Sequence, residues 1–456
     1  MTALIKSLFE EENRLNATSE IISWIERRNR EVAVQVDKVS FADLRGWHFD
    51  VVTGNLVHDS GRFFSIEGID VRTNTGFEQR WTQPIINQPE VGYLGIICKE
   101  FDGVLYFLLQ AKIEPGNVNC VQLSPTLQAT RSNYTQVHGG KKPAYLEYFQ
   151  NAKSDQIILD QLQSEQGARF LRKRNRNMII RVDEDVEVAE DFRWLTLGQI
   201  KTLMRRDNTV NMDTRTVLSG LRLEGEGTSH LASALFASEQ AKTGVMTLDN
   251  VLHHLSELKS RFELVVEKIP LKDVKDWVIT PAEIVHKDHR FFRVLGVNVT
   301  IANREVARWC QPIVQPLQEG LCVLFAKKIH GILHFLLQAK VECGNFDLVE
   351  FAPTIQCLTG SWTNPQGYVP DFLPEFLSGT VVDRILFDTK QSEEGGRFYH
   401  EQNRNVICLV NDQVPNEPNA RFVWLTLGQI KEFLRFNNYL NIQVRSLISA
   451  LPYTEG

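Results

Sequence analysis

The chain of 456 residues contains one long segment twice. "WLTLGQIK" occurs unchanged at 194–201 and 424–431, and "FLLQAKIEPGN" from Phe107 returns as "FLLQAKVECGN" from Phe335. "SEQGARF" at 164–170 likewise returns as "SEEGGRF" at 392–398. The offset stays at 228 to 230. A constant offset over a unit of about 200 residues indicates tandem duplication of a domain. The predicted domains are 1–223 and 247–456, joined by a polar linker at 224–246.

Bulk composition narrows the class of protein. Hydrophobic residues make up 43% and charged residues 23%, as in ordinary soluble globular proteins. The net charge of −6 argues against a general nucleic-acid binder. No apolar run is long enough to span a bilayer, and the start lacks the core of a signal peptide. Seven cysteines without a C-x-x-C pair favour reduced thiols. These features predict a soluble cytoplasmic protein.

Residue patterns predict the same mixed α+β fold for each copy. In the first copy, apolar and β-branched runs indicate strands at 62–73, 92–100, 104–113, 120–125 and 176–182. The Asp102-Gly103 pair predicts a hairpin between two of them. Helices are expected at 18–30, with Thr18 as N-cap, and at 155–167, 196–206 and 212–221. The second copy opens with a matching helix at 247–262. The order of elements favours a mainly antiparallel sheet.

The predicted helix at 155–167 carries a trace of a known motif. "LDQLQSEQGARF" resembles the helix of Nudix hydrolases, R-E-apolar-x-E-E-x-G, whose carboxylates hold magnesium ions. Aligning on Gly167 leaves Glu165 as the single carboxylate at the glutamate positions. The second copy keeps Glu393 and Glu394 but has Lys390 or Thr389 at the first position. We therefore expect a tandem duplication of a Nudix-like mixed sheet-and-helix domain without a metal site.

Other common nucleotide and catalytic motifs are absent from the sequence. There is no G-x-G-x-x-G after a strand, no P-loop and no G-x-S-x-G elbow. Bound nicotinamide, P-loop phosphoryl transfer and an α/β-hydrolase triad are therefore not expected.

One segment differs sharply between the copies. "SPTLQATRSNYTQVHGGKK" at 124–142 answers "APTIQCLTGSWTNPQGYVP" at 352–370. Arg131, Tyr134 and His138 align with Thr359, Trp362 and Gln366, and the two lysines at 141–142 are also lost. Drift on an exposed loop is one explanation. The other is that chemistry occurs in the first copy while the second only binds, because proton transfer needs groups such as His and Tyr.

Residues repeated in both copies are candidates for ligand binding. Each tryptophan pair, Trp47 with Trp277 and Trp81 with Trp309, fits either core packing or a stacking platform for a base. Lys112 fits either a pocket or an exposed strand end. Arginines beside the predicted helix end and between paired asparagines suit a diphosphate, and two serines could add hydroxyl donors or simply belong to the helix: Arg169, Arg397, Arg176, Arg404, Ser164 and Ser392.

At these segments the chain resembles the NDP-hexose 2,3-dehydratases of deoxysugar biosynthesis. "LSPTLQATRSNYTQVHGGKKPAYLEYF", "FLLQAK", "QGARF" with "RNRN", and "WLTLGQI" carry the resemblance, which spans nearly the whole chain. It implies loss of water across C2 and C3 of a dTDP-4-keto-6-deoxyhexose, giving a 3,4-diketo-2,6-dideoxy sugar for a partner ketoreductase. It also implies two Nudix-like domains, a nucleotide-sugar pocket in each, a homodimer, and no metal or redox cofactor. A non-catalytic nucleotide-sugar binding protein and a divergent Nudix pyrophosphohydrolase are the alternatives.

The implied chemistry assigns roles to residues. The 4-ketone acidifies the C3 hydrogen, so the protein needs a base near C3, an acid near the C2 hydroxyl and donors for the enolate oxygen. We expect Tyr134 and His138 to share the acid and base roles, without deciding which is the base, and Arg131 or Lys112 to support the oxyanion. Trp47 would face the thymine. Further substrate contacts are expected from Gln128, Thr130, Ser132, Asn133, Thr135 and Asn175. The second pocket would use Trp277, Arg397, Asn403, Arg404 and Asn405, with Thr359, Gly360, Ser361 and Trp362 in place of the reactive loop.

Overall fold

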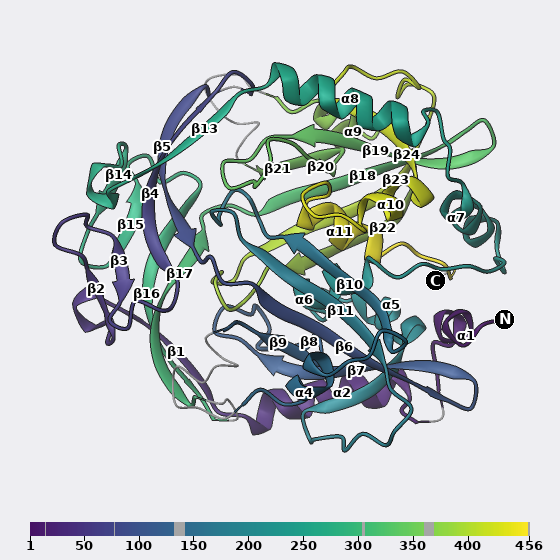
Figure 1. Ribbon diagram of the computed structural model, residues 1–456, viewed down its shortest axis with the longest axis horizontal. Coiled ribbons are helices and arrows are strands. Elements are labelled where there is room, and N and C mark those ends of the chain that lie inside the picture. The colour runs from purple at the N-terminus through teal and green to yellow at the C-terminus, as the bar shows by residue number, and fades with distance from the viewer. Residues whose placement is uncertain (14, 77, 132–141, 303–305, 360–368, 455–456) are drawn as a thin grey trace.

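The computed structural model describes residues 1–13, 15–76, 78–131, 142–302, 306–359 and 369–454. The described elements form a mixed α+β fold in which each repeat contributes strands to a seven-stranded and a five-stranded sheet. In Figure 1 the two seven-stranded sheets lie on the right and the two five-stranded sheets on the left. Helix α2 (Thr18–Glu31) runs along the bottom of this view and α8 (Leu248–Arg261) along the top.

The first seven-stranded sheet belongs to the first repeat. Its path is β10 (Ile157–Ser164), β11 (Arg174–Arg181), β6 (Gly92–Phe101), β7 (Val104–Ile113) and β12 (Phe192–Thr196), with β8 (Val121–Ser124) on β7 and β9 (Leu127–Ala129) on β6. Strands β6 and β11 pair in parallel and the other neighbours antiparallel. Asp102 and Gly103 both take positive φ in the tight turn joining β6 to β7, which confirms the predicted hairpin.

The second repeat builds the same sheet from equivalent strands. The path is β20 (Glu350–Pro353), β19 (Ile332–Lys340), β18 (Gly320–Ile329), β23 (Gln402–Val410) and β22 (Val382–Ser392). Strand β21 (Ile355–Leu358) pairs with β18, and β24 (Phe422–Thr426) pairs with β19. The parallel pair is again at the centre, between β18 and β23. The predicted mainly antiparallel, mixed sheet is therefore found in both copies.

The repeats exchange their first strands. Strand β1 (Val34–Val39) leaves the first repeat and pairs along its length with β16 (Phe292–Ile301), whose sheet also holds β14 (Trp277–Ile279), β15 (Glu283–His286) and β17 (Arg308–Pro316). Reciprocally, β13 (Leu264–Ile269) pairs with β4 (Ser65–Thr73), beside β2 (Trp47–Phe49), β3 (Leu56–His58) and β5 (Arg80–Asn87). Each five-stranded sheet therefore contains one strand from the other repeat.

Glycines let the two repeats approach at backbone distance. The Gly116 amide donates to the Gly395 carbonyl at 2.8 Å, and the Gly344 amide donates to the Gly167 carbonyl at 2.6 Å. A Cβ on Gly116 would lie 1.7 Å from the Phe398 carbonyl oxygen, so no larger residue fits there. "PGN" follows β7 and "CGN" follows β19. The glycine of each therefore lies against the segment of the other repeat that contains Gly395 or Gly167.

Helices close the sheets in equivalent places. Thr196 and Gln199 form a capping box that starts α5 (Leu197–Met204), and Thr426 and Gln429 do the same for α10 (Leu427–Phe433). Helices α6 (Met212–Leu218) and α11 (Ile442–Ser449) follow them. Shorter elements are α4 (Leu146–Gln150), α9 (Leu373–Ser378), and the 3₁₀ turns η1 (Phe41–Asp43) and η2 (Leu271–Asp273).

Helix α7 (His230–Gln240) occupies in the second repeat the place that α1 (Ala3–Phe9) occupies in the first. The Ser7 hydroxyl accepts from the Leu197 amide at 2.8 Å, and the Ser238 hydroxyl accepts from the Leu427 amide at the same distance. The same serine contact therefore recurs in both repeats, and residues 230–240 of the predicted linker form a helix.

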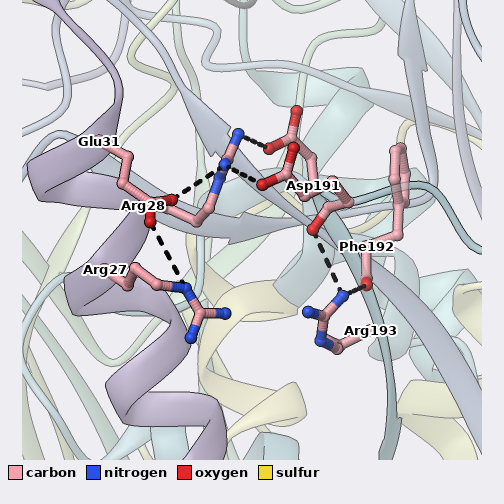
Figure 2. A network of polar contacts seen from close by, with 7 residues as sticks. Arg27, Arg28, Glu31, Asp191, Phe192 and Arg193 are labelled. Atoms are coloured by element: carbon pink, nitrogen blue, oxygen red, sulfur yellow. Dashed lines mark hydrogen bonds and ion pairs between the residues drawn. The ribbon is translucent and has the colours of Figure 1, made fainter.

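Helix α2 is held to its sheet by charge as well as by its apolar face. Figure 2 shows Arg28 of α2 pointing toward Asp191, the residue before β12. Its guanidinium also pairs with Glu31 at 3.3 Å and Glu190 at 2.9 Å. Ile21, Trp24 and Ile25 of the same helix are buried. This packing fixes the start of β1, which continues from α2 into the other repeat's sheet.

Two sequence expectations about elements were wrong. Residues 157–164 form strand β10 rather than part of a helix at 155–167, because they pair with β11 at the sheet edge. The Nudix box register assigned to that helix therefore has no helix to carry it. Thr18 is the first residue of α2, and Ala17 is the N-cap. None of the described helices is long and apolar enough to cross a membrane.

Candidate functional site

Two large cavities lie where a seven-stranded sheet meets the other repeat. The first cavity has a volume of about 980 Å³ and the second about 890 Å³. The first is lined by strand ends of the first repeat together with Trp309, Gly396 and Arg397 of the second. The second is lined by equivalent strand ends of the second repeat together with Trp81, Ala168 and Arg169 of the first. Because of the strand exchange and the glycine contacts, both repeats contribute to the walls of each of these two cavities.

An aromatic wall closes one side of the first cavity. Trp47 is 8% exposed and donates its indole N–H to the Cys310 carbonyl at 2.8 Å. His58 meets Trp47 edge to face, with ring centroids 5.2 Å apart. The Arg397 guanidinium lies 4.2 Å from the Phe64 ring centroid. Because this arginine is fixed over an aromatic face next to the cavity, it provides a positioned cation for an anionic ligand.

Polar side chains from β7, β9 and α6 form the floor of the first cavity. The Lys112 ammonium donates to the Gln128 carbonyl at 3.4 Å, and Lys112 is only 7% exposed. The Gln128 amide donates to Glu114 Oε1 at 3.0 Å. Ser124 donates its hydroxyl to Gln128 Oε1 at 2.8 Å. A buried lysine held this way suits stabilisation of negative charge that develops on a substrate oxygen.

Buried ionisable groups surround this floor. Burial raises the pKa of Glu394 to about 7, with the charges of Glu165 and Glu114 adding to the rise and Arg397 opposing it. Burial likewise raises the pKa of Asp213 well above its ordinary value. Burial lowers the pKa of Lys173. A cavity with several perturbed carboxyl groups is equipped to hold and release protons near neutral pH.

The second cavity repeats the aromatic wall but changes the ionisable groups. Trp277 donates to the Thr82 carbonyl at 3.1 Å, and Arg169 lies 4.4 Å from the Phe292 centroid. Lys340 donates to the Gln356 carbonyl at 3.0 Å. Three positions differ: Gln443 stands for Asp213, Gln166 for Glu394, and Glu401 for Lys173. The second cavity thus keeps binding groups and loses two of the carboxyl groups of the first, but it gains one in Glu401, whose pKa burial raises.

The sequence that differs most between the copies begins and ends at the cavities. Thr130 and Pro143 line the first cavity, and Leu358 and Pro370 line the second. Tyr134 and His138 lie outside the described residues, as do Ser132, Asn133, Thr135, Gly360, Ser361 and Trp362. The described ends of both segments are therefore at cavity walls rather than on a remote surface.

The other predicted site residues line the first cavity, the second cavity or neither. The first cavity holds Trp47, Lys112, Gln128, Thr130, Asn175, Trp309 and Arg397. The second holds Trp81, Arg169, Trp277 and Asn403. Neither is lined by Arg131, Ser164, Arg176, Thr359, Ser392, Arg404 or Asn405. Arg397 was expected in the second pocket and lies in the first, because the glycine contact carries it across the repeat boundary.

Several predicted ligand-binding groups are engaged within the fold. Arg176 makes a two-pronged ion pair with Asp160, at 2.7 and 2.5 Å, and Arg404 makes the same pair with Asp388, at 2.9 and 2.6 Å. They lie within strands β11 and β23, not in turns.

The two serines are also engaged. The Ser164 hydroxyl donates to Glu350 at 2.8 Å and that of Ser392 to Gln122 at 2.7 Å. Both serines are buried and serve the contact between repeats.

Sequence reasoning missed the buried carboxyl groups at the first cavity. Glu114 and Asp213 were not singled out, and Glu394 was considered only as a glutamate of the Nudix box, although Asp213 against Gln443 and Glu394 against Gln166 can be read by aligning the repeats. Their significance depends on burial and on strand exchange, which the alignment does not reveal. Among the described residues, no group of three His, Cys, Asp or Glu side chains is arranged to hold a metal ion.

The first cavity combines an aromatic wall, buried cations and proton-exchanging carboxyl groups, and so defines a protein suited to acid–base chemistry on an anionic ligand with an aromatic end. The sequence profile of the NDP-hexose 2,3-dehydratases matches residues 18–221 and 248–451. The chain belongs to this family and is a carbon–oxygen lyase of the 2,3-dehydratase type.

Curated relatives match over nearly their whole length. A dTDP-4-dehydro-6-deoxy-alpha-D-glucopyranose 2,3-dehydratase of Saccharopolyspora spinosa is 45% identical over 96% of this chain and 92% of the relative. An enzyme of the same name from Amycolatopsis orientalis is 42% identical, over 95% and 90%. A third, from Streptomyces violaceoruber, is 40% identical, over 96% and 98%.

Proposed function

We propose that this enzyme removes water across C2 and C3 of a dTDP-4-keto-6-deoxyhexose of glucose configuration, giving a dTDP-3,4-diketo-2,6-dideoxyhexose. The names of the three relatives support the substrate. The observation that carries the proposal is the asymmetry of the two cavities: the first alone combines Lys112 with Asp213 and Glu394. Removing a proton beside a ketone and expelling a hydroxyl requires such proton-exchanging groups.

We assign turnover to the first cavity and ligand binding without turnover to the second. Residues 1–223 would form the catalytic repeat, 224–246 the connection and 247–456 the secondary binding repeat. Tyr134 and His138 would exchange protons with the sugar, because their segment starts and ends at the first cavity. Lys112 is the better candidate for the enolate oxygen, because it lines the cavity whereas Arg131 is exposed outside the lining.

The remaining parts of the proposal concern fold class and surroundings. A Nudix-like domain is supported by the mixed sheet with one central parallel pair, and not by the residues once read as its box. A homodimer and a downstream ketoreductase follow from the family resemblance. A cytoplasmic setting fits seven cysteines that are all free, of which Cys98 and Cys343 have a pKa raised to about 12 by burial.

The test is incubation with fresh dTDP-4-keto-6-deoxyglucose in the presence of a chelator, followed by mass spectrometry. Loss of one water from the sugar supports the proposal. Release of dTMP would instead indicate pyrophosphate hydrolysis, and a thermal shift without turnover would indicate a binding protein. Either of these two outcomes would end the dehydratase assignment for this chain.

A further inference from the structure

Asp213 is a buried acid at the floor of the first cavity, and the proposed function counts it among the proton-exchanging groups without assigning it a step. It lies in the first turn of α6 and is 2% exposed, yet its side chain lines the cavity. Lys112 and Glu114 from the end of β7 line the same floor, and Glu394 reaches it from the second repeat. Asp213 therefore lies where the end of β7 in the first repeat meets the segment around Glu394 in the second.

The local fold fixes this position firmly. The Asn211 amide N–H donates to the Leu123 carbonyl at 2.9 Å, and the Thr214 hydroxyl donates to the same carbonyl at 3.0 Å. The Asn211 side chain caps the helix through the Thr214 amide at 2.9 Å. Because Asn211 and Thr214 are both bound to β8, the backbone that carries Asp213 is fixed beside the cavity.

The surroundings favour the neutral acid form of Asp213. Burial raises its pKa first, and the neighbouring carboxyl groups of Glu394, Glu165 and Glu114 raise it further, with Lys112 opposing. Glu114 adds an independent sign of an unfilled polar site, because its Oε2 atom is buried without a hydrogen-bond partner among the described residues. A carboxylic acid whose pKa is raised by its surroundings can give its proton to a departing oxygen.

The second repeat offers a comparison within the same chain. Gln443 occupies the equivalent position on α11 and lines the second cavity. Asn441 caps that helix by accepting from the Val444 amide at 3.0 Å, and its own backbone N–H donates to the Phe351 carbonyl at 2.9 Å, so the backbone setting of Asn211 is retained. A glutamine can accept and donate hydrogen bonds but has no proton to transfer. The one chemical ability lost at this position is therefore proton donation.

We propose that Asp213, rather than Tyr134 or His138, is the general acid that protonates the C2 hydroxyl as it leaves the sugar. This assignment rests on the proposed function. A base takes the C3 proton, and the C–H electron pair enters the C3–C4 bond to give an enolate. The enolate then collapses, forming C2=C3 and breaking C2–O, and the Asp213 proton converts the departing hydroxyl to water. The enol's C3 hydroxyl loses a proton and C2 gains one, which returns base and acid to their starting states.

This division of labour predicts a separation of partial reactions. In Asp213→Asn and Asp213→Gln, water loss from dTDP-4-keto-6-deoxyglucose should fall by about 10²- to 10⁴-fold, the usual contribution of a general acid. Exchange of the C3 hydrogen with solvent deuterium should persist, because the base remains. The 2-fluoro-2-deoxy analogue should keep most of its turnover, because fluoride leaves with less help from a proton.

Controls separate this assignment from a structural effect. Asp160→Asn removes a carboxylate of the same repeat that lies outside both cavities and should leave water loss unchanged. Asp213→Gln installs the side chain that the second repeat already accommodates. If either variant folds and loses C3 exchange together with water loss, or turns over the fluoro analogue no better than the natural substrate, the assignment is wrong. Unchanged water loss in both would also overturn it. Failure of the unmodified enzyme to release water refutes the proposed function instead.

Discussion

At the scale of single residues, the two cavities allow equivalent residues to be compared within one molecule. Lys112 and Lys340 occupy equivalent strand ends and donate to equivalent glutamine carbonyls, at 3.4 and 3.0 Å. Their immediate surroundings differ in charge, because Asp213 near Lys112 is replaced by Gln443 near Lys340. A pair of matched substitutions can therefore separate loss of chemistry from loss of packing.

Lys112→Met should lower the rate of water loss by about 10²- to 10³-fold, the cost of removing one donor to a developing oxyanion. The long apolar part of the side chain is kept, so folding should be little changed. Lys340→Met should reduce the rate far less. The measurement is kcat for both variants together with their melting temperatures, and equal losses at similar melting temperatures would contradict the assignment of chemistry to the first cavity.

Single residues also show how far sequence reasoning reached. Lys112, for which a pocket and an exposed strand end were both open, lines the first cavity, as do Gln128 and Asn175, and their roles toward a substrate stay predictions. Arg176 and Arg404 pair with carboxylates across the sheet, and such partners cannot be recognised before the strand pairing is known. Asp213 was missed because its burial is set by tertiary contacts.

At the scale of elements, the strand at 157–164 was mistaken for a helix. The spacing of the apolar residues Ile157, Leu159 and Leu162 fits the period of a helix as well as that of a strand, so the pattern alone does not decide between the two. The segment is a strand because it pairs with β11 as β10. By contrast the helices after Thr196 and Asn211 were predicted correctly, because capping residues and apolar periodicity agree there.

The contact between β10 and β20 carries a testable pH dependence. Burial raises the pKa of Glu350 to about 7, and its carboxylate accepts from Ser164 at 2.8 Å. Because the folded state holds this proton more tightly than the unfolded chain, the stability contribution of Glu350 is full below about pH 4.5 and is lost as pH rises to about 7.

Glu350→Gln should therefore become more stable relative to the unmodified enzyme as pH rises from 5 to 8, by at most about 3 kcal/mol, since one pKa unit corresponds to roughly 1.4 kcal/mol. Urea unfolding of both proteins across this range measures the difference. A stability difference that stays constant, or that changes in the opposite direction, would show that Glu350 is charged in the fold throughout.

At the scale of the whole molecule, exchanged first strands join the repeats into one unit. Strands β1 and β13 have the same pattern, so the sequence fits pairing within a repeat as well as pairing between repeats. The duplication was therefore evident from the sequence. The residues that line each cavity were not, because the sequence left the choice between these two pairings open. One core also contains buried residues of both repeats, among them Ile5, Leu94, Val297 and Tyr453.

Separated halves should therefore not work alone. Fragments 1–226 and 227–456 each lack a strand of one five-stranded sheet and one wall of each cavity. Produced singly, they should show no cooperative thermal unfolding and no water loss, whereas co-expression should restore both. Cooperative unfolding with turnover by the isolated fragment 1–226 would contradict the exchanged architecture.

The central claim is that chemistry takes place in the first cavity, which the second repeat helps to build. Arg397 and Arg169 test it directly, because each stacks on a phenylalanine of the opposite repeat, at 4.2 and 4.4 Å, and each lines one cavity. The measurement is the rate of water loss for Arg397→Lys and Arg169→Lys. We predict a large loss for Arg397→Lys and near-normal turnover for Arg169→Lys; the reverse order would place the reaction in the second cavity and refute the account.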